Sequence, residues 1–247
     1  MNKKDISAYY TQESSQYSQK RYEGKLVSYP QYIFRTRLGI VEKIFAPLVL
    51  GLKEQGGVSL FDIGCADGSV VRRLDQITQK ALVQIDAVDI APGMVEQARK
   101  QTIDTRFNYF LRGDEAQDKK YEIVTELGVY VGDLESEFEH VSNKLKSGGY
   151  FIYGVAAKYS IEARVRKLRQ EGVDFLDTYP TIRHIKKVAI NAGFSIESAY
   201  SYGIFVPKLW GIPAIAPFMQ KIIDTCFNWI PGTRGLFHET VFVFKKR

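Results

Sequence analysis

The stretch "LFDIGCADGSVV", residues 60–71, decides the fold, because an apolar run passes through a glycine turn into a helix-like pattern. Residues 58–64 are rich in strand formers, and apolar residues recur at helical spacing from Val70 onward. The residues of the turn between them are small except for Asp67. We interpret the stretch as strand, tight turn and helix, with a turn kept bare so that a ligand can approach its backbone.

The same unit recurs along the chain. Further strands are expected at residues 82–90, 106–113, 121–129 and 148–156, with helical patterns at 91–101 and 133–145 between them. Strands that alternate with helices over short links indicate a parallel sheet covered on both faces, which is an α/β fold.

Ligands of such sheets bind at the carboxyl ends of the strands, where the first turn comes closest to them. Gly64 and Gly68 remove the Cβ atoms that would block this approach, while Cys65 and Ala66 keep the turn slim. Asp89 ends the second strand, where a carboxylate can accept both hydroxyls of a ribose. The sequence therefore predicts a site for a nucleoside-like ligand.

The turn departs from the pattern that binds dinucleotides. Ala66 and Ser69 stand where that pattern has its second and third glycines, and Asp67 would repel a pyrophosphate at the helix N-terminus. Residues 51–157 carry more acidic than basic side chains, which suits a cationic ligand. These features favour S-adenosylmethionine, which has a sulfonium and no phosphate, over a nicotinamide cofactor.

Four segments resemble the signatures of class I S-adenosylmethionine-dependent methyltransferases. They are "DIGCADG" (62–68), "VDIAPGMVEQAR" (88–99), "RGDEAQ" (112–117) and "NKLKSGGYFIYG" (143–154). The resemblance implies a Rossmann-like, seven-stranded, mostly parallel sheet with helices on both faces and a helical cap. It also implies an antiparallel last strand at "ETVFVFKK" (239–246).

The resemblance also implies roles for individual residues. The cofactor-binding residues would be Asp62, Gly64, Cys65, Ala66, Gly68, Asp89, Ile90, Met94, Asp114 and Glu126. The turn backbone would hold the methionine part, and Asp62 would brace it. Asp89 would bind the ribose, Ile90 and Met94 the adenine faces, and Asp114 the adenine amine.

The catalytic residues are harder to predict, because methyl transfer needs a base only where the nucleophile is protonated. Glu126 and Tyr130 follow the fourth strand and are our candidates, ahead of His140 and His184 on predicted helices. Glu126 and Glu135 also resemble the acidic clamp of protein arginine methyltransferases, although that family's threonine-histidine-tryptophan loop is missing.

The segment after the fourth strand also lacks the Asn/Asp-Pro-Pro-aromatic motif of nucleic-acid amine methyltransferases, so no nucleic-acid partner is expected. The two cysteines and three histidines have no metal-type spacing, so no metal is expected.

Two segments lie outside the predicted core at 51–202 and last strand at 238–247. Residues 1–50 are expected to form a helical lid, with Tyr17, Arg21 and Tyr22 facing the ligands. Residues 203–237 are expected to form an apolar cap with two short amphipathic helices. In it, Trp210, Phe218 and Trp229 would line an acceptor pocket rimmed by Lys208, Lys221 and Arg234. The alternatives for this cap are contact with an anionic membrane surface and a purely structural role.

The sequence therefore predicts an S-adenosylmethionine-dependent methyltransferase that methylates an oxygen of a small or lipid-linked acceptor. An NAD-dependent oxidoreductase and a non-catalytic cofactor-binding or membrane-associated protein are the alternatives. The N-terminus lacks the apolar run of a secretion signal, and no stretch reaches the ~18 apolar residues of a membrane span. We expect a cytoplasmic protein, either free or peripheral to a membrane, whose oligomeric state the sequence leaves open.

Overall fold

The chain is built around a seven-stranded sheet with the strand order β3-β2-β1-β4-β5-β7-β6. The computed structural model describes residues 3–54, 56–116, 118–129, 132–170 and 178–247. The strands are β1 (Val58–Ile63), β2 (Leu82–Asp89), β3 (Phe107–Leu111), β4 (Tyr121–Leu127), β5 (Leu145–Ala156), β6 (Phe194–Tyr202) and β7 (Glu239–Lys246). Strand β7 runs antiparallel to β5 and β6, and the remaining pairs are parallel, which confirms the predicted sheet.

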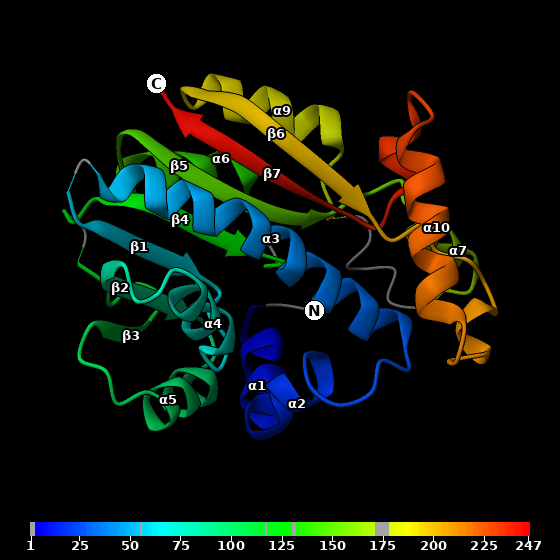
Figure 1. Cartoon of the computed structure of the whole chain (residues 1–247), viewed down its shortest axis with the longest axis horizontal. Coiled ribbons are helices and arrows are strands. Elements are labelled where there is room, and N and C mark those ends of the chain that lie inside the picture. The colour runs from blue at the N-terminus through cyan, green and yellow to red at the C-terminus, as the bar shows by residue number, and fades with distance from the viewer. Residues whose placement is uncertain (1–2, 55, 117, 130–131, 171–177) are drawn as a thin grey trace.

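Helices cover both faces of this sheet (Figure 1). The helices are α1 (Lys3–Glu13), α2 (Tyr17–Arg21), α3 (Tyr29–Lys53), α4 (Ser69–Ile77), α5 (Pro92–Gln101), α6 (Leu134–Lys144), α7 (Ile161–Leu168), α9 (Ile182–Asn191) and α10 (Ala216–Asn228). Helices α3, α4 and α5 bury apolar side chains in one cluster, and α6 and α9 bury theirs in a second cluster. The predicted cover on both faces is therefore confirmed.

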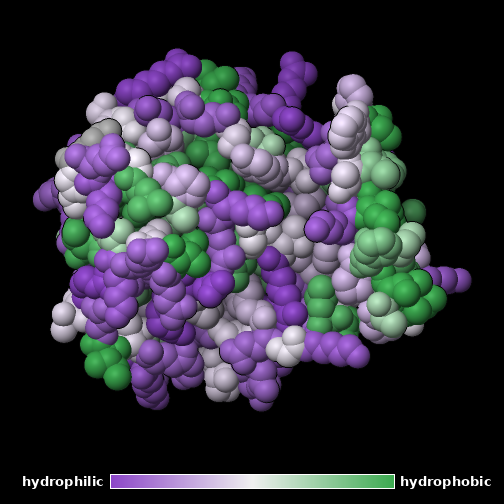
Figure 2. Space-filling view, in the orientation of Figure 1, coloured by the Kyte–Doolittle hydropathy of each residue, from purple (hydrophilic) through white to green (hydrophobic). Residues whose placement is uncertain are grey.

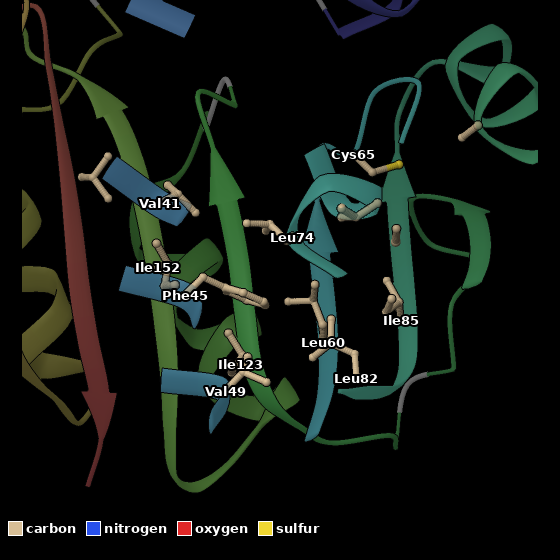
Figure 3. Packing of buried hydrophobic residues seen from close by; sticks show 14 of the residues in the cluster. Val41, Phe45, Val49, Leu60, Cys65, Leu74, Leu82, Ile85, Ile123 and Ile152 are labelled. Atoms are coloured by element: carbon tan, nitrogen blue, oxygen red, sulfur yellow. The ribbon is translucent and has the colours of Figure 1, made fainter. Parts of the chain in front are cut away.

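The first cluster shows how the long helix α3 is fixed to the sheet. Val41, Phe45 and Val49 lie one turn apart on α3 and share one apolar cluster with Leu60 of β1 and Ile123 of β4 (Figure 3). All five side chains are fully buried, so each contributes about 1.5–3 kcal/mol relative to exposure. Only the helices ahead of α3 are thus free to act as a lid, and the second half of α3 belongs to the core.

The cap differs from the two short helices that we expected. It contains the 13-residue helix α10, with Pro217 in its first turn, between the 3-10 turns η2 (Leu209–Gly211) and η3 (Thr233–Leu236). Proline suits the first turn of a helix, whereas Pro213, just ahead of it, falls where the chain must turn. Among the described residues, no helix is both long and apolar enough to cross a membrane.

Candidate functional site

A cavity of about 1490 Å³ opens at the carboxyl ends of the parallel strands. Gly64, Asp89, Gly128 and Ala156 line it at the ends of β1, β2, β4 and β5, and Glu239 lines it at the start of β7. Parallel α/β sheets bind their ligands at this edge. The position of the cavity therefore matches the site that the glycine turn indicates.

The turn after β1 leaves no room for a side chain. Gly64 has φ +78°, and a Cβ atom built on it would lie 2.2 Å from Cγ2 of Val129. Ala66 also adopts a left-handed conformation, with φ +49°, which L-residues other than glycine rarely adopt. The result is a bare backbone cradle at the wall of the cavity.

The carboxylate of Asp89 fastens this cradle to the second strand. Its Oδ2 accepts a hydrogen bond from the Ala66 N–H at 2.9 Å, and its Oδ1 accepts one from the Ala91 N–H at 2.8 Å. Burial raises the pKa of Asp89, and the backbone hydrogen bonds oppose that rise. The backbone N–H of Ile90 also interacts with the carboxylate, which keeps lone-pair capacity to accept a hydroxyl of a ribose.

Apolar residues flank the carboxylate. Met94 is buried in a small cluster with Ala66 and Ala91, on which Tyr10 and Tyr17 of the N-terminal helices pack. Met94 and Ile90 both line the cavity. Apolar side chains therefore lie beside Asp89 in the cavity wall, where the resemblance expects the adenine.

Three residues that the resemblance assigns to the cofactor lie behind the turn and not in the cavity wall. Asp62 is buried in β1 and accepts a hydrogen bond from the Thr125 hydroxyl, and burial raises its pKa to about 7. Cys65 packs into the first apolar cluster. Gly68, with φ +75°, caps helix α4, where a Cβ would come within 2.7 Å of the Tyr109 hydroxyl. These residues shape the turn from behind.

The end of β3 is arranged differently from our expectation. Asp114 is exposed and is not among the described residues that line the cavity. Its place in the wall is taken by Arg112 of the same loop, whose Nη2 donates to Oε1 of Glu137 at 2.6 Å. Arg112 opens the signature segment "RGDEAQ", but its pairing with Glu137 has no signal in the sequence, because the contact joins a loop to a helix that follows a later strand.

Glu126, our candidate for both cofactor binding and catalysis, is 0% exposed and absent from the described part of the cavity wall. Neither of its carboxylate oxygens has a hydrogen-bond partner among the described residues. Burial raises its pKa well above the usual range, and the nearby charge of Glu137 adds to the rise against the opposing effect of Arg112. This environment favours a protonated, neutral Glu126, which is a poor base.

The other residues proposed for catalysis lie elsewhere. Tyr130 falls outside the described residues. Glu135 lines the cavity on α6, where its carboxylate lies 3.6 Å from Nε2 of His184. Because Glu126 is buried while Glu135 borders the cavity, the two do not present paired carboxylates to a guanidinium ligand. Within the described part of the chain, no group of three or more metal-ligating side chains is placed to hold a metal ion.

The N-terminal helices α1 and α2, which we expect to act as a lid, contact the turn directly. The Ser18 hydroxyl donates to the carboxylate of Asp67, and the Ser7 hydroxyl donates to the Ile90 carbonyl at 2.9 Å. Tyr17 lines the cavity, and the Arg21 guanidinium lies 4.0 Å from the centre of its ring.

The rest of the predicted lid packs on α3. The ring of Tyr22 contacts the ring of Phe34 on this helix. The Arg21 guanidinium lies 5.2 Å from the centre of the same Phe34 ring. Tyr22 and Arg21 are not among the described residues of the cavity wall, so they hold the lid in place from behind Tyr17.

The cap residues that we expected at the acceptor pocket do not line the described cavity. Trp210 packs on Tyr29 and Tyr32 of α3, whereas Phe218 and Trp229 are 69% and 84% exposed. Lys208, Lys221 and Arg234 are also exposed. These three basic side chains therefore form part of the outer surface and do not rim the cavity.

A histidine that the sequence analysis did not single out stands in the cavity wall. His238 precedes β7, and its Nδ1 lies 2.6 Å from Oε2 of Glu162 on α7. No local sequence pattern signals this pair, because the two residues come from distant segments.

A family model described as "methyltransferase domain" matches residues 34–199. A comparison with curated proteins finds no match.

Three solved structures illustrate the similarity of fold. The magnesium protoporphyrin IX methyltransferase from Synechocystis PCC 6803 with bound SAH has a TM-score of 0.64 at 16% identity, over 99% of both chains. A similar structure from Listeria monocytogenes has a TM-score of 0.60 at 16% identity, over 86% of this chain and 97% of that one. An S-adenosylmethionine-dependent methyltransferase from Mesorhizobium loti has a TM-score of 0.58 at 17% identity, over 85% and 98%.

Proposed function

Because the chain belongs to the methyltransferase domain family, we propose that it transfers the methyl group of S-adenosylmethionine to an oxygen of a small or lipid-linked acceptor. The observation that supports this is the cavity of about 1490 Å³. Pockets that hold one drug-sized ligand measure about 300–1,000 Å³, so this cavity has room for an acceptor beside the cofactor.

The residues present fit the cofactor. Asp89 binds the ribose hydroxyls, Ile90 and Met94 enclose the adenine, and the backbone at Gly64 and Ala66 holds the methionine part. S-adenosylmethionine supplies a methyl group that its sulfonium already activates. The lid, with Tyr17 in its inner wall, excludes water and orients the acceptor, which is the main task left to the protein.

The acceptor occupies the part of the cavity beyond the turn. Phe34 and Ile33 of α3, Val155 of β5 and Pro180 line that part, with Tyr179 beside them. These apolar and aromatic side chains suit a small hydroxylated ring or a polyprenyl-type chain, and charged residues such as Arg37, Lys158 and Glu239 line the same cavity.

The experiment is a transfer assay with methyl-labelled S-adenosylmethionine. Phenols, hydroxylated quinones, hydroxylated lipids and magnesium protoporphyrin IX are offered, the last because it appears in the name of a similar structure. Gly64→Ala serves as the inactive control. We expect a labelled product whose new methyl lies on oxygen by NMR. A product methylated on nitrogen or carbon, or a protein that does not bind S-adenosylhomocysteine, would refute the proposal.

A second part of the proposal concerns the cap, which we place on an anionic membrane surface. Helix α10 buries the polar residues Gln220 and Asp224 and exposes Phe218, Met219 and Ile222. Large apolar side chains therefore gather over α10 on the face of the molecule shown in Figure 2. Exposed apolar patches of this kind mark sites of association with proteins or membranes.

The charges of the cap favour lipid as the partner. Lys208, Lys221 and Arg234 are exposed, whereas Asp224, the one acidic residue between positions 203 and 237, is buried. Leu168 at the end of α7 adds a further exposed apolar side chain, within a helix that also carries basic residues. A surface that combines exposed apolar side chains with exposed cations alone suits an anionic bilayer.

Vesicle sedimentation tests this part. We expect the protein to bind phosphatidylcholine vesicles that contain phosphatidylglycerol, to bind pure phosphatidylcholine vesicles at least tenfold more weakly, and to dissociate as salt is added. Trp229→Asp and Phe218→Asp should abolish binding, whereas Ile103→Asp should not, because Ile103 is 97% exposed but lies outside the cap. Equal binding to both vesicle types, or a dimer that Trp229→Asp dissociates, would contradict the proposal.

A further inference from the structure

The backbone of His238 is fixed at the acceptor side of the cavity. Its N–H donates to the Gly203 carbonyl at 3.0 Å, and its carbonyl accepts from the Ala157 N–H at 2.9 Å. These bonds hold the residue between the ends of β5 and β6 and the start of β7. The backbone that carries the imidazole is therefore fixed at the cavity wall.

The side chain is oriented by a carboxylate. Nδ1 of His238 lies 2.6 Å from Oε2 of Glu162, and the two side chains are 16% and 15% exposed. Burial acts to raise the pKa of Glu162, but His238 and Arg166 outweigh it and hold that pKa below its usual value. Glu162 is thus ionised at neutral pH. Neither Nδ1 nor Oε2 meets hydrogen-bond geometry with any described residue, so the carboxylate acts on the ring through its charge, and a proton on Nδ1 relieves the repulsion between the Nδ1 lone pair and the Glu162 oxygen.

A tyrosine ring also packs against the imidazole of His238. Tyr29 of α3 packs edge-on against the imidazole, with ring centres 5.9 Å apart. Its own hydroxyl donates to the Gly203 carbonyl at 2.7 Å, so the tyrosine is itself fixed. Because Nδ1 lies against Glu162, Nε2 is the ring nitrogen left to meet a ligand.

The other two histidines of the chain lack this support. His184 also lines the cavity, but its Nε2 lies 3.6 Å from Glu135, and those side chains are 45% and 65% exposed. His140 lies near the ring of Phe61, and burial lowers its pKa. Of the three, His238 is the one paired with a largely buried carboxylate.

We propose that His238 is the general base of the reaction and that Glu162 is its positioning residue. Nε2 of His238 takes the proton that the acceptor hydroxyl loses as its oxygen bonds to the methyl carbon. The sulfur keeps the electron pair of the carbon–sulfur bond that breaks, so charge balances and an imidazolium forms beside the Glu162 carboxylate. Water then removes the proton. This inference rests on the proposed O-methylation, since a base is needed only where the nucleophile carries a proton.

The first test needs no acceptor. In the S-adenosylhomocysteine complex, two-bond proton–nitrogen NMR spectra of ¹⁵N-histidine-labelled protein should show His238 protonated on Nδ1 with a bare Nε2. Glu162→Leu, which removes the acceptor oxygen, should lose this tautomer preference, and Glu162→Gln, which retains an oxygen, should keep it. A wild-type ring protonated on Nε2 would overturn the proposal, because no lone pair would then face the cavity.

The second test measures turnover with the acceptor found in the transfer assay. His238→Gln should lower kcat about 10²–10⁴-fold while the Kd for S-adenosylhomocysteine stays within about twofold. The control Ile103→Gln, at a residue that is 97% exposed and outside the described cavity wall, should leave kcat unchanged. An O-methylated product made at wild-type rate by His238→Gln would overturn only the assignment of His238 as the base. A product methylated on nitrogen or carbon would overturn the proposed function itself.

Discussion

Replacing Asp89 by alanine tests the cofactor site at the point where the turn and the ligand depend on one carboxylate. The wild-type group accepts backbone hydrogen bonds from Ala66 at 2.9 Å and from Ala91 at 2.8 Å. Asp89→Ala removes both of these bonds together with the acceptor for a ribose. We therefore expect losses in both cofactor affinity and stability.

The two losses differ in size. A hydrogen bond to a charged group contributes about 1.5–3 kcal/mol, so the Kd for S-adenosylhomocysteine should rise roughly 10–150-fold. For stability, two backbone N–H groups lose their partners, which costs about 1–3 kcal/mol. That cost is partly offset, because burial disfavours the charge of Asp89 in the wild-type protein and raises its pKa. The free energy of unfolding should therefore fall by about 1–2 kcal/mol.

Isothermal titration calorimetry measures the Kd, and urea unfolding measures the stability. Asp114→Ala is the matched control, because Asp114 is exposed and outside the described cavity wall, so its Kd should stay within twofold of the wild-type value. A folded Asp89→Ala protein with an unchanged Kd would refute the assigned ribose contact. A large loss at Asp114 would show that the adenine binds where the sequence resemblance suggests.

Three further predictions concern the same turn. Ala66→Gly should raise the free energy of unfolding by about 0.5–1 kcal/mol, since the left-handed conformation at φ +49° costs alanine more than glycine, and an unchanged midpoint in urea would contradict this. Gly64→Ala should abolish calorimetric binding of S-adenosylhomocysteine, because its Cβ would lie 2.2 Å from Cγ2 of Val129, and wild-type binding would count against the cradle. Burial raises the pKa of Asp62 from 3.8 to about 7. Between these pH values the folded state therefore binds more protons than the unfolded state. The stability of the wild-type protein should thus fall relative to that of Asp62→Asn as the pH rises from 4 to 7. Urea unfolding of both proteins at pH 5 and pH 8 measures that difference, and a pH-independent difference would contradict the shift.

The fold could be predicted from local patterns because strand runs and helix starts are local properties. The apolar run of β1 and the proline that starts α5 show this directly. The prediction was less accurate at β5, which begins at Leu145 and not at Gly148. Gly148 has φ +76°, and the pairing of β4 with β5 shifts register there, so the strand continues through an irregularity that looks like a turn in the sequence.

The site was predictable only where one segment supplies the whole chemistry. Asp89 and the turn glycines are placed by the strands that carry them. Glu126 shows the limit of such a prediction. Successive side chains of a strand point to opposite faces, so a position near the end of a strand does not by itself place a side chain in the cavity. Glu126 is buried inside the protein, whereas Leu127 and Gly128 line the cavity. The contact of His238 with Glu162 joins separate segments, and no spacing in the sequence encodes it.

The cap shows why amphipathicity alone does not say which side of a helix faces inward. Asp224 accepts hydrogen bonds from the Gly203 N–H, the Ile204 N–H and the Tyr32 hydroxyl, all at 2.8 Å, and Nε2 of Gln220 donates to the Ile204 carbonyl at 2.7 Å. Those buried groups at the end of β6 would each cost about 1–3 kcal/mol if left without partners. Turning α10 over would bury its apolar side but leave these groups unsatisfied. The polar residues of α10 therefore face the core, and the same requirement holds its apolar side outward, where a bilayer can cover it.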